Sequence, residues 1–239
     1  MVDFVLLTIC HREVTGQTAW SVEKAHSKGT MNFLWVISPG DALVGRARSI
    51  NASYFLESEM APFLIFLDSD IVFEPEELER LYSDLKAGYD FIGGVYPVRG
   101  ESQLAHYGLG EGVAIDGKII EVQFLSCGFT GISKRLLERL VKELPLPILN
   151  EHDWARCYPF FETGRYIEEP YQIYISEDWD FCNKVRSIGG KPYLDTSILL
   201  GHIGKKIYTP QDVVNYQQQK AAAEMTPSVC EPNEEENNK

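Results

Sequence analysis

The stretch Phe63-Leu-Ile-Phe-Leu-Asp68-Ser-Asp70-Ile-Val-Phe-Glu-Pro75 decides the predicted fold of this 239-residue chain. Its first five residues are apolar without interruption, which is typical of a strand buried on both faces. The strand ends on two aspartates, and a helical pattern with acids in its first turn follows over residues 75–86, ahead of Gly88. The stretch therefore predicts a buried strand, two acids at the edge of a sheet and a returning helix.

The same alternation extends over the first 96 residues. Short runs rich in Val, Ile, Leu and Phe predict strands at residues 2–9, 33–37, 62–67 and 90–96. Helical patterns separate them at residues 17–27, 45–57 and 75–86. This alternation predicts an α/β fold with a mostly parallel central sheet and helices on both faces, in which ligands bind beyond the carboxyl ends of the strands.

The pattern changes after Tyr96. We expect a hairpin around Asp116-Gly117 as a smaller antiparallel element, then a helix at 134–142, a strand at 172–175, a helix at 177–187 and strands near Pro192 and Ile198. Residues 144–170 are a loop rich in proline and aromatic side chains, which is either a binding loop or part of the core. We expect a single domain over residues 1–220 and a disordered acidic tail over residues 221–239.

Composition limits the class of protein. With 44% hydrophobic residues the chain can bury one sizeable core, and its formal net charge of −13 argues against nucleic acid and anionic lipid as partners. The five cysteines form no CxxC pair, which favours reduced thiols. No apolar run approaches the roughly 18 residues of a membrane helix, and the N-terminus has no signal-peptide pattern. We therefore expect a cytoplasmic protein without a transmembrane segment.

Asp68 and Asp70 are the sharpest candidates for a site of chemistry. In an extended chain the side chains of residues i and i+2 point the same way, so both carboxylates can share a divalent cation, directly or through water. The alternative is that an aspartate here only caps the following helix. Capping alone does not explain a second acid at the end of a buried strand, so the metal site is favoured.

A second acidic cluster, Glu177-Asp178-Trp179-Asp180, begins the helix predicted at residues 177–187. The helix dipole favours acids at this position whatever their function. If Glu177 or Asp178 faces a crevice, it is also well placed to be the general base that takes a proton from an incoming hydroxyl. From the sequence both interpretations stand.

His202 follows an apolar run and lies between Gly201 and Gly204. Glycine permits close backbone approach, and an imidazole complements a metal shell that two carboxylates leave incomplete. The alternative is an ordinary core or surface histidine. The neighbouring Lys205 and Lys206 either meet a phosphate or form a solvated pair.

In this order, the three motifs resemble those of glycosyltransferases of the family 2-like kind, which have the glycosyltransferase-A fold. The resemblance covers roughly residues 2–210 and rests on the whole set, because each motif alone is weak. It implies that Asp68, Asp70 and His202 bind Mn²⁺ or Mg²⁺ and that Asp70 is the stronger ligand of the two aspartates. It also implies that Asp178, in the Glu177-Asp178 pair, is the catalytic base of a hexosyltransferase-type reaction, with inversion favoured. In a retaining reaction no base is needed at this position, and the acidic cluster would instead orient the sugar.

The resemblance further implies a nucleotide-sugar site. Residues after the first strand would receive the nucleotide base, the segment 41–51 would reach the nucleotide or diphosphate, and the small residues 126–131 would line the sugar pocket. An arginine fork suits a diphosphate well, although both arginines of this segment are alternatively helix surface charges. The turn at 126–131 is alternatively a plain connection to the next helix. The expected nucleotide-sugar ligands are Thr8, Cys10, Arg12, Asp41, Arg46, Arg48, Asp68, Ser69, Asp70 and Gly128.

The expected activity is transfer of a sugar from a nucleotide-diphosphate donor, UDP-sugar favoured over GDP-sugar, to the hydroxyl of a glycan, a lipid-linked acceptor or a protein. Residues 1–96 would be the nucleotide-binding half and residues 97–220 the acceptor-side half. The alternatives are a metal-dependent phosphohydrolase and a sugar-nucleotide-binding module without turnover. The phosphohydrolase fits less well, since its Asp-x-Asp follows the first strand, and nucleotidyl transfer lacks a Gly-rich loop with trailing Arg and Lys.

Overall fold

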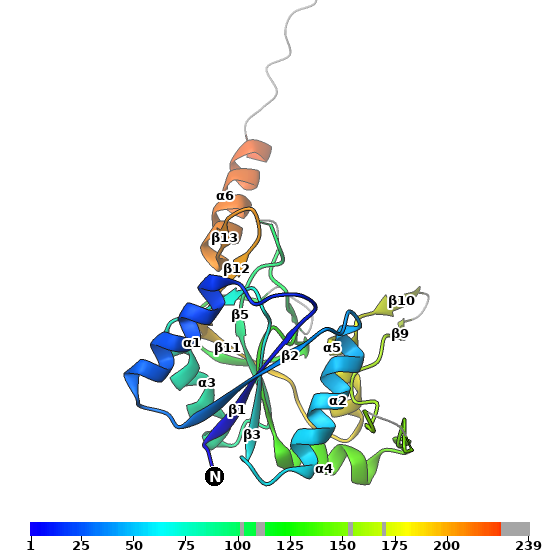
Figure 1. Cartoon of the computed structure of the whole chain (residues 1–239). Helices are drawn as coiled ribbons and strands as arrows, with labels where there is room; N and C mark the ends of the chain where they lie inside the picture. The colour runs from blue at the N-terminus through cyan, green and yellow to red at the C-terminus, as the bar shows by residue number, and fades with distance from the viewer. Residues whose placement is uncertain (101–102, 109–112, 153–154, 169–170, 226–239) are drawn as a thin grey trace, which may run out of the picture.

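An eight-stranded sheet forms the centre of the protein, with strand order β2-β1-β3-β8-β5-β11-β7-β6 (Figure 1). The computed structural model describes residues 1–100, 103–108, 113–152, 155–168 and 171–225. Five strands of the sheet run in the same direction: β1 (Phe4–Cys10), β2 (Phe33–Pro39), β3 (Phe63–Leu67), β5 (Phe91–Val95) and β11 (Tyr193–Leu199). Their carboxyl ends therefore lie at one edge of the sheet, as the α/β prediction requires.

Three strands complete the sheet against the dominant direction or at its edge. β8 (Phe129–Ser133) is inserted between β3 and β5 and is antiparallel to both, while β7 (Ile119–Phe124) and β6 (Tyr107–Gly108) form the edge beyond β11. The sequence predicts a turn through residues 126–131, and this is wrong from Phe129 onward. All five residues of β8 are buried between their neighbours, so tertiary pairing decides their conformation.

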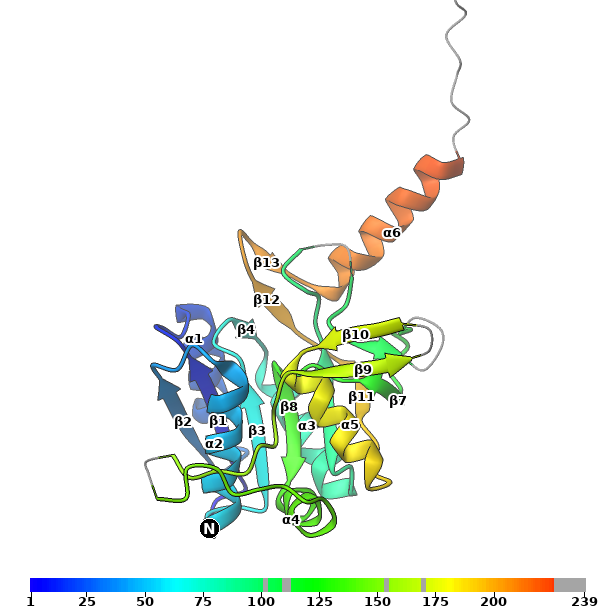
Figure 2. The same ribbon diagram turned by 90° about the vertical axis from the view of Figure 1, so that its right-hand side faces the viewer.

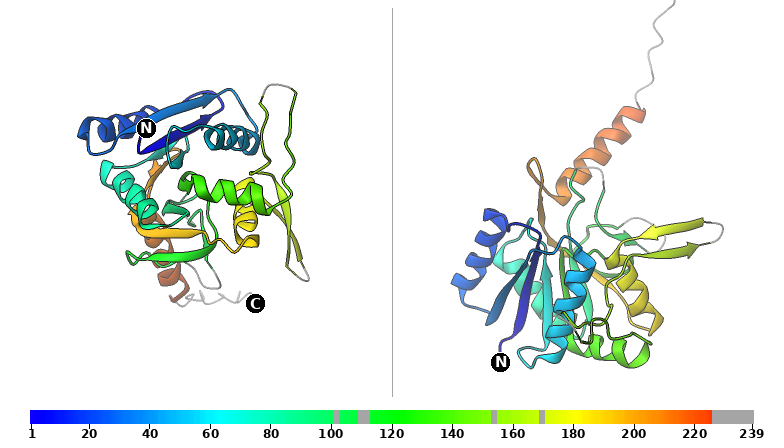
Figure 3. Two further views of the ribbon diagram at one scale, coloured as in Figure 1. Left: turned by 90° about the horizontal axis from the view of Figure 1, so that it is seen from below. Right: turned by 45° about the vertical axis from the view of Figure 1, so that its right-hand side comes forward.

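Helices cover both faces of the sheet (Figures 2 and 3). On one face the core contains side chains of α1 (Gly16–Lys28) and α3 (Pro75–Ala87). On the other it contains side chains of α2 (Val44–Glu57), α4 (Lys134–Glu143) and α5 (Glu177–Ser187). The α3 start follows local rules, with a Glu74–Glu77 capping box and Pro75 in the first turn.

Smaller antiparallel elements stand at the carboxyl edge. β4 (Ile71–Val72), β12 (Gly201–Ile203) and β13 (Ile207–Tyr208) form a three-stranded sheet, and β9 (Gly164–Glu168) pairs with β10 (Tyr171–Ile175) in a separate arm. The strands predicted near Pro192 and Ile198 are one strand, β11. The predicted hairpin at Asp116-Gly117 is not a tight one, because β6 pairs with β7 and Gly117 precedes β7 in a left-handed turn.

The chain continues past the predicted domain end. α6 (Pro210–Met225) projects from the body of the molecule (Figures 1 and 2), so residues 221–225 are helical and not part of a disordered tail. The rest of the predicted tail, 226–239, lies outside the described residues. Within the described ranges, no helix is both long and apolar enough to cross a membrane.

Candidate active site

The β4–β12 pairing brings Asp70 and His202 together at the carboxyl edge of the sheet. His202 lies opposite Ile71 in the ladder, and the N–H of Ile203 donates to the Asp70 carbonyl at 2.9 Å. As a result His202 Nε2 lies 3.5 Å from Asp70 Oδ2. The two predicted metal ligands, far apart in the sequence, therefore share one site.

The tautomer of His202 is set by its backbone partner. Nδ1 lies 2.8 Å from the Pro97 carbonyl, which can only accept a hydrogen bond, so Nδ1 carries a proton and Nε2 is directed at Asp70. Burial tends to lower the pKa of His202, but the Asp70 carboxylate and the Pro97 carbonyl raise it overall. Burial likewise tends to raise the pKa of Asp70, but His202 and Arg99 lower it overall. Each of the two side chains therefore favours the charged form of the other.

Asp68 and Asp70 have different partners. The chain turns at Ser69–Asp70, so the extended geometry expected from the sequence is wrong. Asp68 Oδ1 accepts from Nη2 of Arg48 at 2.7 Å, whereas Asp70 Oδ2 accepts from Arg99. Burial raises the pKa of Asp68 although Arg48 opposes this effect.

Arg48 joins β3 to the acidic start of α5. Its side chain is only 4% exposed, and Nη1 donates to Glu177 Oε1 at 2.5 Å while Nη2 holds Asp68. The Nε atom is buried without a hydrogen-bond partner among the described residues. Both terminal nitrogens of Arg48 are therefore bonded inside the protein. The predicted contact of Arg48 with the diphosphate would require these bonds to break.

Asp178 differs from Glu177 in its contacts. Its Oδ1 accepts from the Ser176 hydroxyl and from the Trp179 N–H at 2.9 Å, which is the pattern of a helix N-terminus. Its Oδ2 has no hydrogen-bond partner in the described part of the chain. Of the two acids that the sequence leaves open as the base, Glu177 is ion-paired with Arg48, whereas Asp178 is bonded to groups of its own helix start.

Gly128 allows the backbone after β7 to pack against Asp68. The Asp68 N–H donates to the Gly128 carbonyl at 2.8 Å, and the Gly128 N–H donates to the buried Tyr96 hydroxyl at 2.8 Å. A Cβ at this position would lie 2.5 Å from the Tyr96 oxygen and 3.2 Å from Asp68 Oδ2. Only glycine fits here, so the small-residue turn predicted from the sequence does border the acidic pair.

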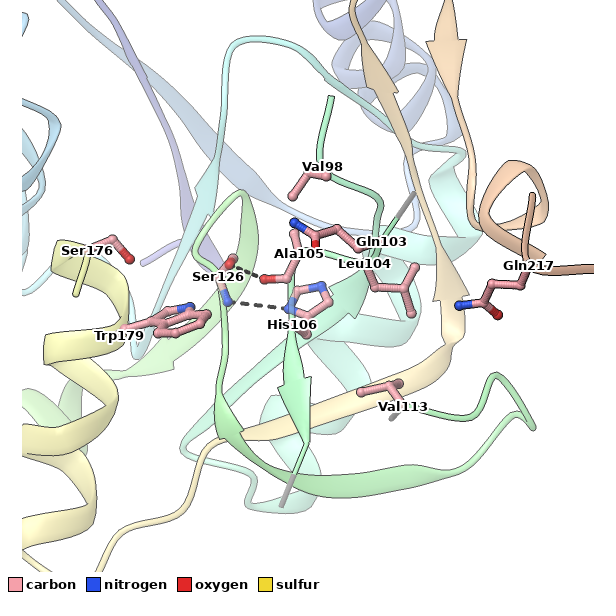
Figure 4. Close-up of a pocket in the computed structure, with 10 residues that line it drawn as sticks. All are labelled: Val98, Gln103, Leu104, Ala105, His106, Val113, Ser126, Ser176, Trp179 and Gln217. Atoms are coloured by element: carbon pink, nitrogen blue, oxygen red, sulfur yellow. Dashed lines mark hydrogen bonds between the residues drawn. The ribbon is translucent and has the colours of Figure 1, made fainter. Parts of the chain in front are cut away.

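A cavity of about 490 Å³ opens beside this cluster (Figure 4). Ser176 and Trp179, which flank Asp178, line it from α5, and Gln217 lines it from α6. Ser126 and His106 form the wall between them, where the Ser126 N–H lies 3.3 Å from His106 Nδ1. Burial lowers the pKa of His106 to about 3, so this wall is uncharged at neutral pH. The cavity offers hydroxyl and amide groups beside an indole ring.

The remaining predicted nucleotide ligands lie around the carboxyl ends of β1 and β2. Thr8 is buried, and its hydroxyl accepts a hydrogen bond from the indole N–H of Trp35 at 3.0 Å. Cys10 is buried at the end of β1. Arg12 is exposed just beyond. The Asp41 carboxylate accepts hydrogen bonds from Nε and Nη2 of Arg46, at 2.8 and 2.9 Å. This ion pair lowers the pKa of Asp41. Thr8 and Cys10 thus have little accessible surface, whereas Arg12, Asp41 and Arg46 border solvent.

The aromatic loop, Lys206 and Ser69 make structural contacts within the protein. In the aromatic loop, Phe160 and Phe161 are buried, and Phe161 stacks on Phe181 with 4.4 Å between ring centroids, so they belong to the core. Trp154 lies outside the described residues. Lys206 pairs with Asp212 at 3.0 Å. Ser69 contributes its carbonyl, which accepts from the Thr15 N–H at 2.9 Å.

The site fits a divalent cation held by two protein ligands. In the described ranges no three His, Cys, Asp or Glu side chains gather closely enough to hold a metal ion by themselves. Asp70 and His202 do offer a carboxylate oxygen and a correctly oriented imidazole nitrogen, with the backbone support that metal-binding histidines have. Mg²⁺ commonly takes one or two protein ligands and completes its shell with substrate phosphates and water.

Arg99, Tyr96 and His106 belong to the site but are missing from the sequence prediction. One signal could have found Arg99: the segment Tyr96-Pro-Val-Arg99 follows a predicted strand of the same parallel sheet, so it reaches the same edge as Asp68. The same signal covers Tyr96, the last residue of that predicted strand, but it does not extend to His106.

Comparisons with known proteins bear on the fold. No family model matches the chain, and no curated protein matches it. Among solved structures, the crystal structure of A197 from STIV matches with a TM-score of 0.59 and 20% identity, over 87% of this chain and 91% of A197. S. aureus TarS 1–349 has 12% identity and a TM-score of 0.45, over 95% of this chain and 66% of TarS 1–349. The protein therefore shares the fold of A197, and its chemistry has to be inferred from the site.

Proposed function

We propose that this protein is a metal-dependent glycosyltransferase that moves a sugar from a nucleotide-diphosphate donor to an acceptor hydroxyl. The observation that carries the proposal is the meeting of Asp70 and His202, 3.5 Å apart, at the carboxyl edge of an α/β sheet and close to the acidic start of α5. Ligands bind at this edge in open α/β sheets. The order of the three sequence motifs supports the same activity.

Each residue of the cluster has a role in this proposal. Asp70 Oδ2 and His202 Nε2 would hold Mn²⁺ or Mg²⁺, and the Oδ2 of Asp68 would act through a water molecule bound to the ion. Such an ion supplies Lewis acidity at the leaving diphosphate oxygen. The Arg12 and Asp41 side chains border the end where the nucleotide, UDP in preference to GDP, would lie. Arg48 holds Asp68 and Glu177 in place and balances their charge.

The acceptor is proposed to bind in the cavity lined by Trp179, Ser126 and Gln217. A sugar ring can pack on an indole face and bond to hydroxyl and amide groups at its edge. Asp178, whose Oδ2 is available, would accept the proton of the attacking hydroxyl. A base on the acceptor side favours inversion at the anomeric carbon. A glycan, lipid-linked or protein acceptor all present such a hydroxyl.

Two alternatives fit the structure less well. In a phosphohydrolase with an Asp-x-Asp pair the acids follow the first strand, whereas Asp68 and Asp70 follow β3. A sugar-nucleotide-binding module without turnover has no use for the available Oδ2 of Asp178.

The proposal is tested with Asp70→Ala. Wild-type protein should be stabilised by a nucleotide sugar together with Mn²⁺ in a thermal-shift screen of UDP- and GDP-sugars, since a ligand of the folded state raises apparent stability. Asp70→Ala should keep the fold but lose the Mn²⁺-dependent shift and the transfer of sugar. Asp116→Ala, which removes a surface carboxylate paired with Lys118, should retain both. Turnover retained in Asp70→Ala would refute the proposed function.

A further inference from the structure

Arg99 is a cationic side chain of the candidate site for which the proposed function has no role. It follows β5, its side chain is 67% exposed, and its Nη2 donates to Asp70 Oδ2. Asp70 itself is largely buried. The same carboxylate oxygen thus faces the guanidinium of Arg99 and Nε2 of His202.

The short segment from Pro97 to Arg99 determines both contacts. The Pro97 carbonyl orients the imidazole of His202, and Arg99, two residues later, neutralises Asp70. Because the Pro97 carbonyl is bonded to His202, the backbone of this segment is held beside the site, while the exposed side chain of Arg99 can change its partner.

A divalent cation on Asp70 Oδ2 would compete with Arg99 for that oxygen. Two cations on a single carboxylate oxygen repel each other, and the exposed, flexible arginine is the one that can leave at little cost. A guanidinium released at this edge of the sheet would meet the diphosphate of the donor, for which its planar fork is well suited.

Two other arginines near the edge are not available for this exchange. Arg48 is buried with both terminal nitrogens bonded to Asp68 and Glu177. Arg46 is bound through two nitrogens to Asp41, in a bidentate pair. Among the described residues Arg99 has one ion-pair partner, Asp70, and it is mostly exposed to solvent.

We propose that Arg99 is an exchangeable partner, which neutralises Asp70 in the donor-free protein and binds the donor diphosphate once a divalent cation occupies Asp70. The diphosphate half of this inference rests on the proposed function. The exchange predicts two opposite effects of one substitution: removal of Arg99 should strengthen metal binding and weaken nucleotide binding.

Calorimetric titrations of the full chain test both halves. Without nucleotide, Arg99→Ala should bind Mn²⁺ about two- to fivefold more tightly than wild type, the range expected from loss of a competing exposed ion pair. At saturating Mn²⁺, the same variant should bind UDP or GDP, whichever wild type binds better, about tenfold or more weakly. Arg99→Lys, which keeps the charge but not the fork, should bind Mn²⁺ as wild type does and the nucleotide with intermediate affinity.

Arg135→Ala is the matched control. Arg135 is 65% exposed and pairs with Asp90 at 2.7 Å, but it lies at the opposite end of β5. Both affinities should be unchanged in this variant. Unchanged or weaker Mn²⁺ binding by Arg99→Ala, unchanged nucleotide affinity, or absence of Mn²⁺ or nucleotide binding in wild type would each overturn the inference. Opposite shifts in a protein that transfers no sugar would support the exchange and refute only the proposed function.

Discussion

Glu177 and Asp178 are neighbours in the chain, but their carboxylates have different partners. Glu177 is bound to the buried Arg48, and burial raises the pKa of Glu177 although Arg48 opposes the effect. Asp178 is anchored through one oxygen to groups of its own helix start and keeps the other oxygen available. A sequence in which the two acids are adjacent gives no means of assigning these roles, because the distinction depends on Arg48 from α2.

Paired substitutions separate the two acids. Asp178→Asn should lower kcat about 10²–10⁴-fold, the usual contribution of a general base, with little change in the affinity for the nucleotide donor. Glu177→Gln keeps the shape of the side chain but removes half of the charge that balances Arg48, so its main effect should be on the free energy of unfolding. Steady-state kinetics and urea unfolding of both variants provide the measurements. Equal loss of kcat in the two would show that Asp178 has no special role.

Removal of Arg48 should be severe. It would leave Asp68 and Glu177 facing each other's charge without a counterion, and loss of one partner from a buried pair costs about 3–5 kcal/mol. The pKa values of both acids, which burial already raises, would rise further. Groups with a raised folded-state pKa stabilise the protein at low pH, so Arg48→Ala should recover stability as the pH falls. Urea unfolding at pH 5 and pH 8 measures this, and a small loss that does not vary with pH would contradict it.

At the level of elements, the local sequence patterns are sufficient to predict the bounds of most helices. The helices predicted at 17–27, 45–57, 75–86, 134–142 and 177–187 agree with α1 to α5 to within one residue at each end. α6 is the exception, although Thr209-Pro-Gln-Asp212 is a capping signature: the Thr209 N–H donates to the Asp212 carboxylate at 2.7 Å. The sequence that follows is polar and rich in alanine. Its composition favours a disordered tail, and for this reason the helix is not predicted from the capping signature.

Strands and the site depend more on long-range pairing. β8 was missed because its Thr130-Gly131 centre has no strand pattern, and its conformation comes from pairing with β3 and β5. The meeting of Asp70 and His202 follows from a pairing between β4 and β12, two short strands that no local pattern predicts. The residue types of the site, Arg48 included, could be predicted from the sequence. The contacts of Arg48 with Asp68 and Glu177, and of Arg99 with Asp70, could not, because they depend on how separate elements meet.

The close approach of the turn before β8 to β3 can be tested at Gly128. Gly128→Ala would place a Cβ 2.5 Å from the Tyr96 oxygen and 2.8 Å from its Cζ, so the rigid, buried ring or the turn must move. Overpacking of this kind costs about 1–3 kcal/mol. Displacement of Asp68 should also weaken donor binding. Gly16→Ala, where no atom lies within 4 Å of the new Cβ, is the control and should be close to wild type in urea unfolding. A neutral Gly128→Ala would mean that the turn is not tightly packed.

The whole molecule combines a net charge of −13 with two partly buried carboxyl groups whose pKa values lie far above the ordinary range. Burial, with the adjacent Asp195 carboxylate, raises the pKa of Asp84 to about 7. Burial also raises the pKa of Glu77 to about 7, against a hydrogen bond from the Glu74 N–H. Both acids lie on α3, and Asp195, the neighbour of Asp84, belongs to β11, so the contact between Asp84 and Asp195 joins this helix to the sheet.

These groups predict a loss of stability as the pH rises from about 6.5 to 8. In the unfolded chain both acids titrate near pH 4, so the folded state binds more protons in this window and the free energy of unfolding falls with pH. His106, with its pKa lowered to about 3, acts in the opposite direction, but only below about pH 6.5. Asp84→Asn, which cannot ionise, should reduce the slope and be more stable than wild type at pH 8. Asp116→Asn is the control, because Lys118 lowers the pKa of Asp116 and this group titrates outside the window. Urea midpoints at pH 6.5, 7.2 and 8 decide the matter, and an Asp84→Asn slope equal to that of wild type would show that Asp84 is ionised throughout.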